Sequence, residues 1–205
     1  MSELTLYTNP QSRGRIARWM LEEVGKPYET VVLDYATSMK EPAYLAINPM
    51  GKVPAIRHGE TVVTEAAAIC LYLADAFPEA GLAPALGDPA RGPYFRWTLF
   101  AAGPIEAAMT DKALGVVVPK ERERMAGYGT MAHTLDALEG FLSGTEYVAG
   151  GRFSAADVYV GAHLGFGMAF GMIEKRGAFE RYVARLHERP AFRRANELDD
   201  ALVKG

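Results

Sequence analysis

The chain has 205 residues, 49% of them hydrophobic and 23% charged, which is the composition of a soluble globular protein with one large domain or two small ones. Its net charge of −3 gives no reason to expect a nucleic acid or an anionic membrane as a partner. Its single cysteine, Cys70, excludes an internal disulfide and any two-thiol redox motif, and we expect this side chain to be a small core residue.

The N-terminal residues have no basic region leading into a long apolar run, so we expect no signal peptide. No apolar stretch approaches the length that spans a bilayer. The expected location is therefore the cytoplasm, with no membrane partner.

The first predicted elements form a β-α-β unit. Residues 4–7 alternate apolar and polar positions, as a short strand does. Residues 14–24 have apolar side chains at helical spacing, and the Gly-Lys-Pro sequence at 25–27 ends that helix. Residues 28–33 are rich in β-branched side chains and predict a second strand.

The following segment completes a small α/β domain. One helical turn is predicted at 41–45, and strands at 54–57 and 60–63 are joined by a hairpin turn at His58-Gly59. A helix is predicted over 64–77, with threonine as its cap and an acidic residue in its first turn. The order β-α-β-α-β-β-α describes a thioredoxin-like domain.

A segment with four prolines and three glycines, residues 77–93, is the one strong linker signal. The predicted organisation is a thioredoxin-like domain at 1–80, a linker at 81–92 and an all-α domain at 93–205. The helices expected in the second domain cover residues 94–109, 120–143, 155–173 and 179–188.

A capping box is predicted at the start of the helix that begins at Ala155. Ser154 is in the cap position, and the carboxylate of Asp157 lies three residues later, where it reaches back to the cap N–H. Phe153 and Val158 occupy the two positions of a hydrophobic staple.

Several short motifs follow one another in an order that is specific to one family. They are Leu4-Thr-Leu-Tyr7, Leu21-Glu-Glu-Val-Gly25, Asn48-Pro-Met-Gly-Lys-Val-Pro54, Thr64-Glu-Ala66 with Ile69, Tyr72 and Leu73, and Phe153-Ser-Ala-Ala-Asp157. In these motifs, over nearly its whole length, the chain resembles the cytosolic glutathione S-transferases, and its bacterial members in particular.

The resemblance implies that Val53 and Pro54 are joined by a cis bond, which costs only about 0.5–1 kcal/mol before proline. The backbone N–H and C=O of Val53 would then pair with the extended peptide glutathione, as an added strand would. The alternative is an ordinary edge-strand proline that only shapes the fold.

Glu65 and Ala66 stand at a helix N-terminus, where free N–H groups favour an anion. By resemblance, the Ala66 N–H binds the γ-glutamyl carboxylate and Glu65 meets the ammonium group. Lys52 and Lys40 are candidates for the glycyl carboxylate. The alternatives are a first-turn acid that needs no ligand and two solvated surface lysines.

Two hydroxyls compete to activate the glutathione thiol, which the family does with a tyrosine, serine or cysteine near the end of the first strand. Ser12 lies in the loop at the helix start, where the helix dipole favours a thiolate. Tyr7 ends the strand, and Arg13-Gly14-Arg15 is similar to the motif of the tyrosine-type enzymes, although two extra residues separate them here. We favour Ser12 over Tyr7; Asn9 or a backbone donor is a further alternative. Ser12 could instead be a plain helix cap, and Tyr7 a core aromatic.

Four aromatic residues of the helical domain would face the glutathione end and line a hydrophobic substrate pocket, although aromatics at helical spacing are more often core. They are Trp97, Phe100, Phe166 and Phe170.

The expected function is conjugation of the glutathione thiolate to small hydrophobic electrophiles, in detoxification, by a homodimer. Glutathione would be a cosubstrate, with no tightly bound cofactor, and the four histidines show no metal-ligand spacing. The alternatives are a glutathione-dependent peroxidase, dehalogenase or ether-cleaving enzyme, and a non-catalytic protein-interaction module. The isomerase branch lacks support, because its Ser-Ser-Cys motif is absent from the first loop.

Overall fold

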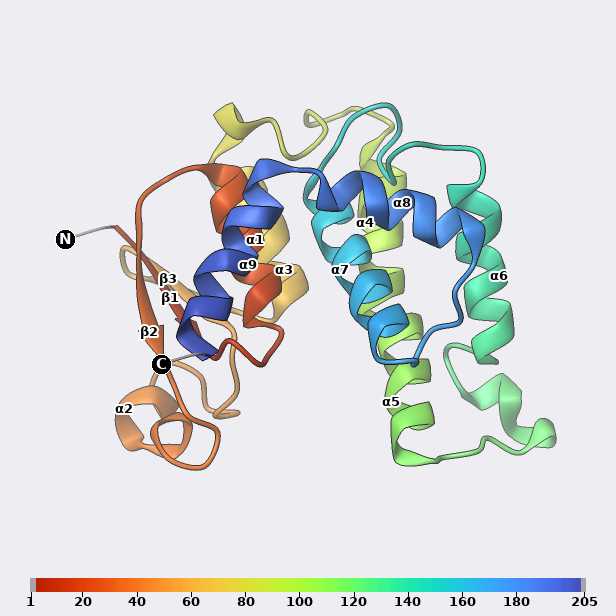
Figure 1. Cartoon of the computed structure of the whole chain (residues 1–205), viewed down its shortest axis with the longest axis horizontal. Coiled ribbons are helices and arrows are strands. Elements are labelled where there is room, and N and C mark those ends of the chain that lie inside the picture. The colour runs from red at the N-terminus through yellow and green to blue at the C-terminus, as the bar shows by residue number, and fades with distance from the viewer. Residues whose placement is uncertain (1–2, 204–205) are drawn as a thin grey trace. The chain divides into compact units, whose positions relative to one another are not determined.

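The structure, a computed structural model, describes residues 3–203 (Figure 1). The chain divides into two compact units. The first unit runs through Leu82 and takes in the chain again from Glu188 onward, and the second is Ala83–His187. No helix among the described residues is both long enough and apolar enough to cross a bilayer.

The first unit contains a four-stranded mixed sheet in the order β2-β1-β3-β4. Strand β1 runs parallel to β2 and antiparallel to β3, and β3 pairs antiparallel with β4. The strands are β1 Leu4–Thr8, β2 Tyr28–Val32, β3 Ala55–His58 and β4 Thr61–Thr64. With the helices between them, this order confirms the predicted thioredoxin-like domain.

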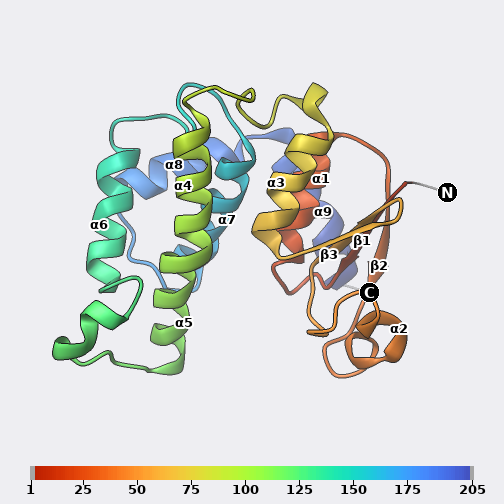
Figure 2. The ribbon, with the colours of Figure 1, turned by 180° about the vertical axis from the view of Figure 1, so that it is seen from behind.

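Helices α1 and α3 lie side by side on the same side of this sheet (Figures 1 and 2). Helix α1 ends as predicted at Gly25, whose φ of 72° suits glycine and whose N–H donates to the carbonyl of Leu21 at 3.0 Å. The helical segments of this part are α1 Gly14–Val24, a 3₁₀ turn at Ser38–Lys40, α2 Pro42–Leu45, α3 Ala66–Ala76 and a 3₁₀ turn at Pro78–Ala80.

The predicted hairpin was wrong by one residue. Strands β3 and β4 each begin and end one position later than expected, so the loop is Gly59 and Glu60. Gly59 has a φ of 55°, which glycine adopts at little cost in the first position of a two-residue hairpin loop.

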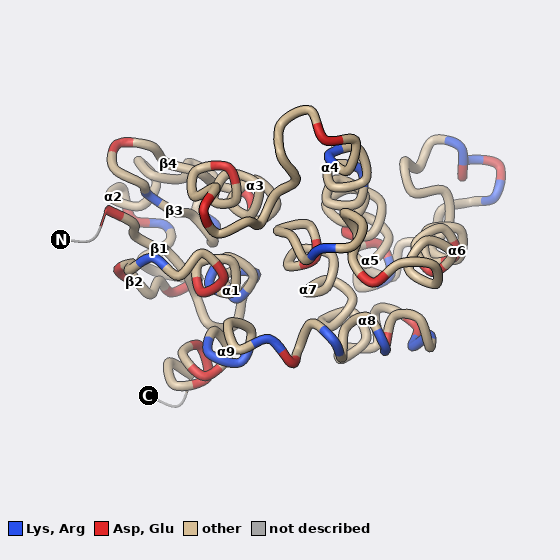
Figure 3. The backbone as a smooth tube through the Cα atoms, turned by 90° about the horizontal axis from the view of Figure 1, so that it is seen from above, with Lys and Arg blue, Asp and Glu red and all other residues tan. Residues whose placement is uncertain are grey.

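The last helix, α9 (Pro190–Val203), was not predicted from the sequence, and it packs against α1 in the first unit. Its basic residues come early and its acidic residues late, as Figure 3 shows, which is the unfavourable order for the helix dipole. Its support comes from tertiary contacts instead. The carboxylate of Asp199 accepts a hydrogen bond from Nε of Arg18 on α1 at 2.9 Å.

The second unit is all-α, as predicted. A π-helical turn at Ala101–Ile105 joins its first two helices and contains Pro104. Because proline has no N–H and its ring crowds the carbonyl four residues earlier, the wider turn lets the helical path continue. The helices are α4 Arg91–Phe100, α5 Glu106–Leu114, α6 Met131–Leu142, α7 Ala155–Ala169 and α8 Gly177–His187.

The helix expected over 120–143 was wrong in its first half. Residues Lys120–Met125 form only a 3₁₀ segment, and Gly129 has a φ of 65°. Helix α6 starts afterwards, where Oγ1 of Thr130 accepts a hydrogen bond from the N–H of His133 at 3.1 Å. Gly127 and Gly129, which follow this segment, disfavour a helix that continues through them.

The predicted capping box at the start of α7 is confirmed. Oδ2 of Asp157 accepts hydrogen bonds from the N–H of Ser154 at 2.9 Å and from its hydroxyl at 3.0 Å. Oδ1 accepts from the N–H of Val148 and from the hydroxyl of Tyr182 on α8, each at 2.8 Å. The carboxyl group therefore joins the start of α7 to α8 as well as capping it.

Candidate functional site

The Val53–Pro54 peptide bond is cis, as the resemblance implied. Pro54 is buried directly before β3, and Val53 is half-buried against a small apolar cluster. Neither the N–H nor the C=O of Val53 has a hydrogen-bond partner among residues 3–203. Both groups can therefore pair with an extended peptide that approaches this turn.

The turn before Val53 is held by its own neighbours. The carbonyl oxygen of Lys52 accepts a hydrogen bond from the hydroxyl of Tyr44 at 2.6 Å and another from Nδ2 of Asn48 at 2.8 Å. Sequence analysis did not assign a role to either side chain. The signals present were the motif that begins at Asn48 and the Asn-Pro pair at 48–49, which favours a turn.

The two candidate lysines flank this turn. Nζ of Lys40 donates a hydrogen bond to the carbonyl oxygen of Gly51 at 2.7 Å. The side chain of Lys52 is exposed. Because an ammonium group has three donors, Lys40 retains capacity for an anionic ligand beside the turn.

Glu65 and Ala66 begin α3 in an unusual conformation. Glu65 has a φ of 66°, the one positive value among the described residues other than glycine. It is the residue before the helix, and its side chain makes no capping hydrogen bond, so the expected threonine cap at 64 was wrong. The N–H groups of Ala66, Ala67 and Ala68 have no partner in the described part of the chain, and these donors favour an anion.

Ser12 lies half-buried in the loop before α1. Its hydroxyl donates to the carbonyl oxygen of Asn9 at 2.6 Å and accepts from the N–H of Gly14 at 2.9 Å. Gly14 is needed at this point, since a Cβ there would lie 1.9 Å from Oγ1 of Thr8 and 2.9 Å from Oγ of Ser12.

Asn9 fixes the shape of this loop, which sequence analysis did not anticipate. Its Nδ2 donates to the carbonyl oxygen of Leu33 at 2.8 Å, and its Oδ1 accepts from the N–H of Gln11 at 2.9 Å. Both polar atoms of its amide are therefore engaged within the protein.

Tyr7, the competing hydroxyl, has a side chain in the apolar interior. It is 9% exposed and belongs to a cluster with Leu33, Met39, Tyr44 and Ala55. Its ring centroid lies 5.8 Å from that of Tyr44. These contacts match the alternative of a core aromatic at the end of a strand.

The four aromatic residues of the second unit differ in exposure. Trp97 is 1% exposed, with its ring centroid 4.6 Å from that of Phe141, so its side chain belongs to the core of that unit. Phe100 is half-buried beside Trp97. Phe166 and Phe170 are 53% and 65% exposed, and their ring centroids are 4.5 Å apart. Only the last two present a large apolar surface.

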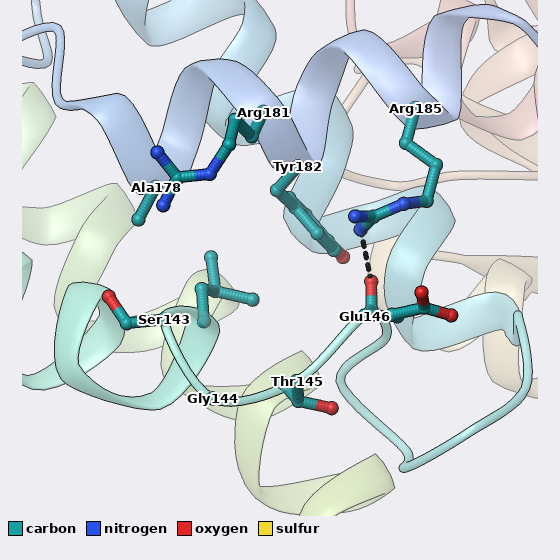
Figure 4. A pocket seen from close by; sticks show the side chains of 9 residues that line it. Ser143, Gly144, Thr145, Glu146, Ala178, Arg181, Tyr182 and Arg185 are labelled. Atoms are coloured by element: carbon teal, nitrogen blue, oxygen red, sulfur yellow. Dashed lines mark hydrogen bonds between the residues drawn. The ribbon is translucent and has the colours of Figure 1, made fainter.

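A polar hollow of about 300 Å³ lies in the second unit between α8 and the turn at 143–146 (Figure 4). None of the predicted site residues lines it. Arg185 donates to the carbonyl oxygen of Glu146 at 2.8 Å, and its guanidinium lies 5.9 Å from the ring centroid of Tyr147. These contacts fasten the turn after α6 and explain the arginine without a ligand.

Among residues 3–203, no three His, Cys, Asp or Glu side chains gather where they could hold a metal ion. Cys70 is fully buried in α3, and burial raises the pKa of its thiol well above the ordinary value. This thiol is therefore not available as a nucleophile in the folded protein.

Residues 2–75 match the family model described as "Glutathione S-transferase, N-terminal domain". Glutathione S-transferase 3 of Zea mays is 31% identical over 176 residues, which cover 77% of this chain and 75% of that protein. A glutathione transferase structure from Methylococcus capsulatus has a TM-score of 0.80 at 28% identity, covering 97% of this chain and 99% of that one. A sphingomonad glutathione S-transferase complexed with glutathione has a TM-score of 0.77 at 31% identity, covering 96% and 98%.

Proposed function

We propose, from the premise that this chain belongs to the glutathione S-transferase family, that it conjugates the thiolate of glutathione to small hydrophobic electrophiles. The observation that carries the proposal is the Val53 backbone, whose two polar groups have no partner in the described chain. The sphingomonad relative, which was solved with glutathione, supports the choice of peptide.

In this proposal glutathione is held at its ends as well as at its centre. The cysteinyl residue pairs with the N–H and C=O of Val53. The γ-glutamyl carboxylate accepts from the Ala66 N–H at the start of α3, and its ammonium meets the carboxylate of Glu65. Lys40 and Lys52 supply positive charge for the glycyl carboxylate.

Ser12 is the proposed activating group. A thiol with a pKa of about 8.5 is half ionised at pH 7 only if its pKa falls by roughly 1.5 units, or about 2 kcal/mol. One hydrogen bond to a charged acceptor is worth about 1.5–3 kcal/mol, so a single hydroxyl suffices.

Rotation of the Ser12 hydroxyl toward the sulfur leaves the Asn9 carbonyl satisfied by the N–H of Ser12 at 3.1 Å. The Gly14 N–H continues to donate to Oγ, which polarises the hydroxyl for donation to the thiolate.

The first prediction separates the two hydroxyls. With glutathione and a chloronitroaromatic, Ser12→Ala is expected to lower kcat/KM by about 10- to 100-fold, the loss of one charge-assisted hydrogen bond. The pH at which the rate is half-maximal should rise with it. Tyr7→Phe should change both values little. Unchanged conjugation in Ser12→Ala together with lost conjugation in Tyr7→Phe would assign the role to Tyr7 instead.

Phe166 and Phe170 are the best candidates for contact with an apolar electrophile, because their side chains are the most exposed of the four predicted aromatics. A protein that binds no glutathione in a calorimeter would instead fit the non-catalytic interaction module.

We further propose, from the resemblance to the cytosolic enzymes, that the protein is a homodimer and works in the cytoplasm in detoxification.

A further inference from the structure

Two buried side chains converge on a single backbone oxygen next to the proposed glutathione site. Tyr44 and Asn48 both donate to the carbonyl oxygen of Lys52, at 2.6 and 2.8 Å. Their own exposures are 3% and 5%. Burial raises the pKa of Tyr44 to about 12, so its hydroxyl keeps its proton, and remains a donor, throughout the physiological range.

The planarity of the peptide unit transmits this arrangement to Val53. The bond between Lys52 and Val53 is trans, so the C=O of Lys52 and the N–H of Val53 point in opposite directions within one plane. Two donors on the carbonyl fix the plane from one side. The Val53 N–H is therefore directed away from Tyr44 and Asn48, and it has no partner among the described residues.

The turn that leads into this peptide, residues 48–51, is also fixed by hydrogen bonds. The Asn48 carbonyl accepts from the N–H of Gly51 at 2.8 Å, and Oδ1 of Asn48 accepts from the N–H of Met50 at 3.1 Å. Nζ of Lys40 donates to the carbonyl oxygen of Gly51. Gly51 has a φ of 57°, and a Cβ there would lie 2.8 Å from the carbonyl oxygen of Met39. The turn is therefore held at several points, three of which are hydrogen bonds made by Asn48.

We propose that Tyr44 and Asn48 are positioning residues for glutathione: they orient the Val53 N–H toward the cysteinyl carbonyl of the peptide without touching it. This inference rests on the proposed function, since it assumes that glutathione binds at Val53. A pre-oriented N–H binds without the cost of ordering the turn at the moment of association. Without the two donors, the peptide plane can rotate and the N–H is aimed correctly for only part of the time.

Tyr44→Phe tests this most cleanly, because the ring keeps its packing against Tyr7 and only the hydroxyl is lost. We expect the Kd for glutathione, measured by calorimetry, to rise about 3- to 10-fold, the effect of one neutral hydrogen bond. Asn48→Ala should weaken binding further. The turnover number at saturating glutathione and the pH profile should not change, because neither residue is part of the thiol-activating loop.

Tyr28→Phe is the matched control. Tyr28 lies in β2 of the first unit, and its pKa is likewise raised to about 12, chiefly by burial. Its hydroxyl donates to Glu22 on α1 at 2.5 Å and accepts from Arg18 at 3.2 Å. It should lower thermal stability at least as much as Tyr44→Phe, because its hydroxyl bonds charged groups, and it should leave the Kd for glutathione unchanged.

The outcomes separate the two proposals. Failure of the unaltered protein to bind glutathione would overturn the proposed function. Binding by the unaltered protein, with Tyr44→Phe and Tyr28→Phe equal to it in affinity, would overturn the positioning role alone. A loss of affinity in Tyr44→Phe that Tyr28→Phe does not share, at a melting temperature no lower than that of Tyr28→Phe, supports it.

Discussion

At the scale of single residues, Glu65 is held in a backbone conformation that favours glycine. Its φ of 66° costs of the order of 1–3 kcal/mol for a residue with a side chain, and such strain persists only where the surroundings impose it. In our proposal its carboxylate faces the ammonium of glutathione, which explains why a residue with a side chain stands there.

We therefore predict opposite effects of Glu65→Gly on stability and on binding. The free energy of unfolding should rise by about 1 kcal/mol, because relief of the strain exceeds the added entropy of the unfolded chain. The Kd for glutathione should rise by about 10- to 100-fold, through loss of one charge-assisted contact. Denaturant unfolding and calorimetry measure the two quantities.

Glu65→Gln serves as the control, because it keeps the strained backbone and removes only the charge. It should weaken glutathione binding without a gain in stability. A Glu65→Gly protein that is less stable than the unaltered one would show that the strain is smaller than the entropy that glycine adds to the unfolded chain.

At the scale of elements, the contact between α1 and α9 depends on a buried ion pair. Arg18 and Asp199 are 3% and 0% exposed, and Nε of the arginine lies 2.9 Å from Oδ1 of the aspartate. Burial raises the pKa of Asp199, and the guanidinium of Arg18 opposes that shift. Both charges were removed from water to make the pair, so each depends on the other.

Asp199→Ala is therefore expected to lower the free energy of unfolding by about 3–5 kcal/mol, because the guanidinium of Arg18 stays buried without its partner. The neighbouring Asp200→Ala breaks an exposed pair with Arg15 and should cost no more than about 1 kcal/mol. Urea unfolding of the two variants under the same conditions provides the comparison. Equal losses would mean that α9 is held by its apolar contacts alone.

The same helix shows where sequence reasoning reached its limit. Strand β1 and helix α1 were predicted because their apolar periodicity and the stop at Gly25 are local signals. Helix α9 carries acidic residues in its later turns, against the helix dipole, and its stabilising partners, Arg15 and Arg18, lie some 180 residues away in the sequence. A short stretch of sequence therefore never contains both members of these pairs, so the local pattern could not reveal them.

The candidate site divides in the same way. Pro54, Glu65 and Ala66 could be chosen from short motifs, since a turn or a helix start gives each a local signal. Tyr44 could not be chosen in this way. Its hydroxyl donates to the carbonyl oxygen of Lys52, eight residues later, and the two groups meet only because several hydrogen bonds set the shape of the turn. Trp97 was offered as a pocket residue, although helical spacing alone cannot distinguish a core side from a ligand side.

At the scale of the whole molecule, the proposed homodimer is testable without a ligand. We expect sedimentation at micromolar concentration to give twice the mass of the 205-residue chain, as the resemblance to the cytosolic enzymes implies. Dilution to nanomolar concentration would locate the dissociation constant. A monomeric mass across the whole range would contradict the homodimer. The glutathione site would then have to be formed by one chain alone.

The path of the chain also constrains protein engineering. The first unit is completed only by the residues from Glu188 onward, after the chain has built the whole second unit. A fragment that ends near residue 82 is therefore not expected to fold as the first unit does. Helix α1 would lose its contact with α9, and Arg18 would lose the carboxylate of Asp199. A chimera that borrows the glutathione-binding half from a relative must take both its beginning and its end. The second unit, by contrast, is one continuous stretch of chain, Ala83–His187.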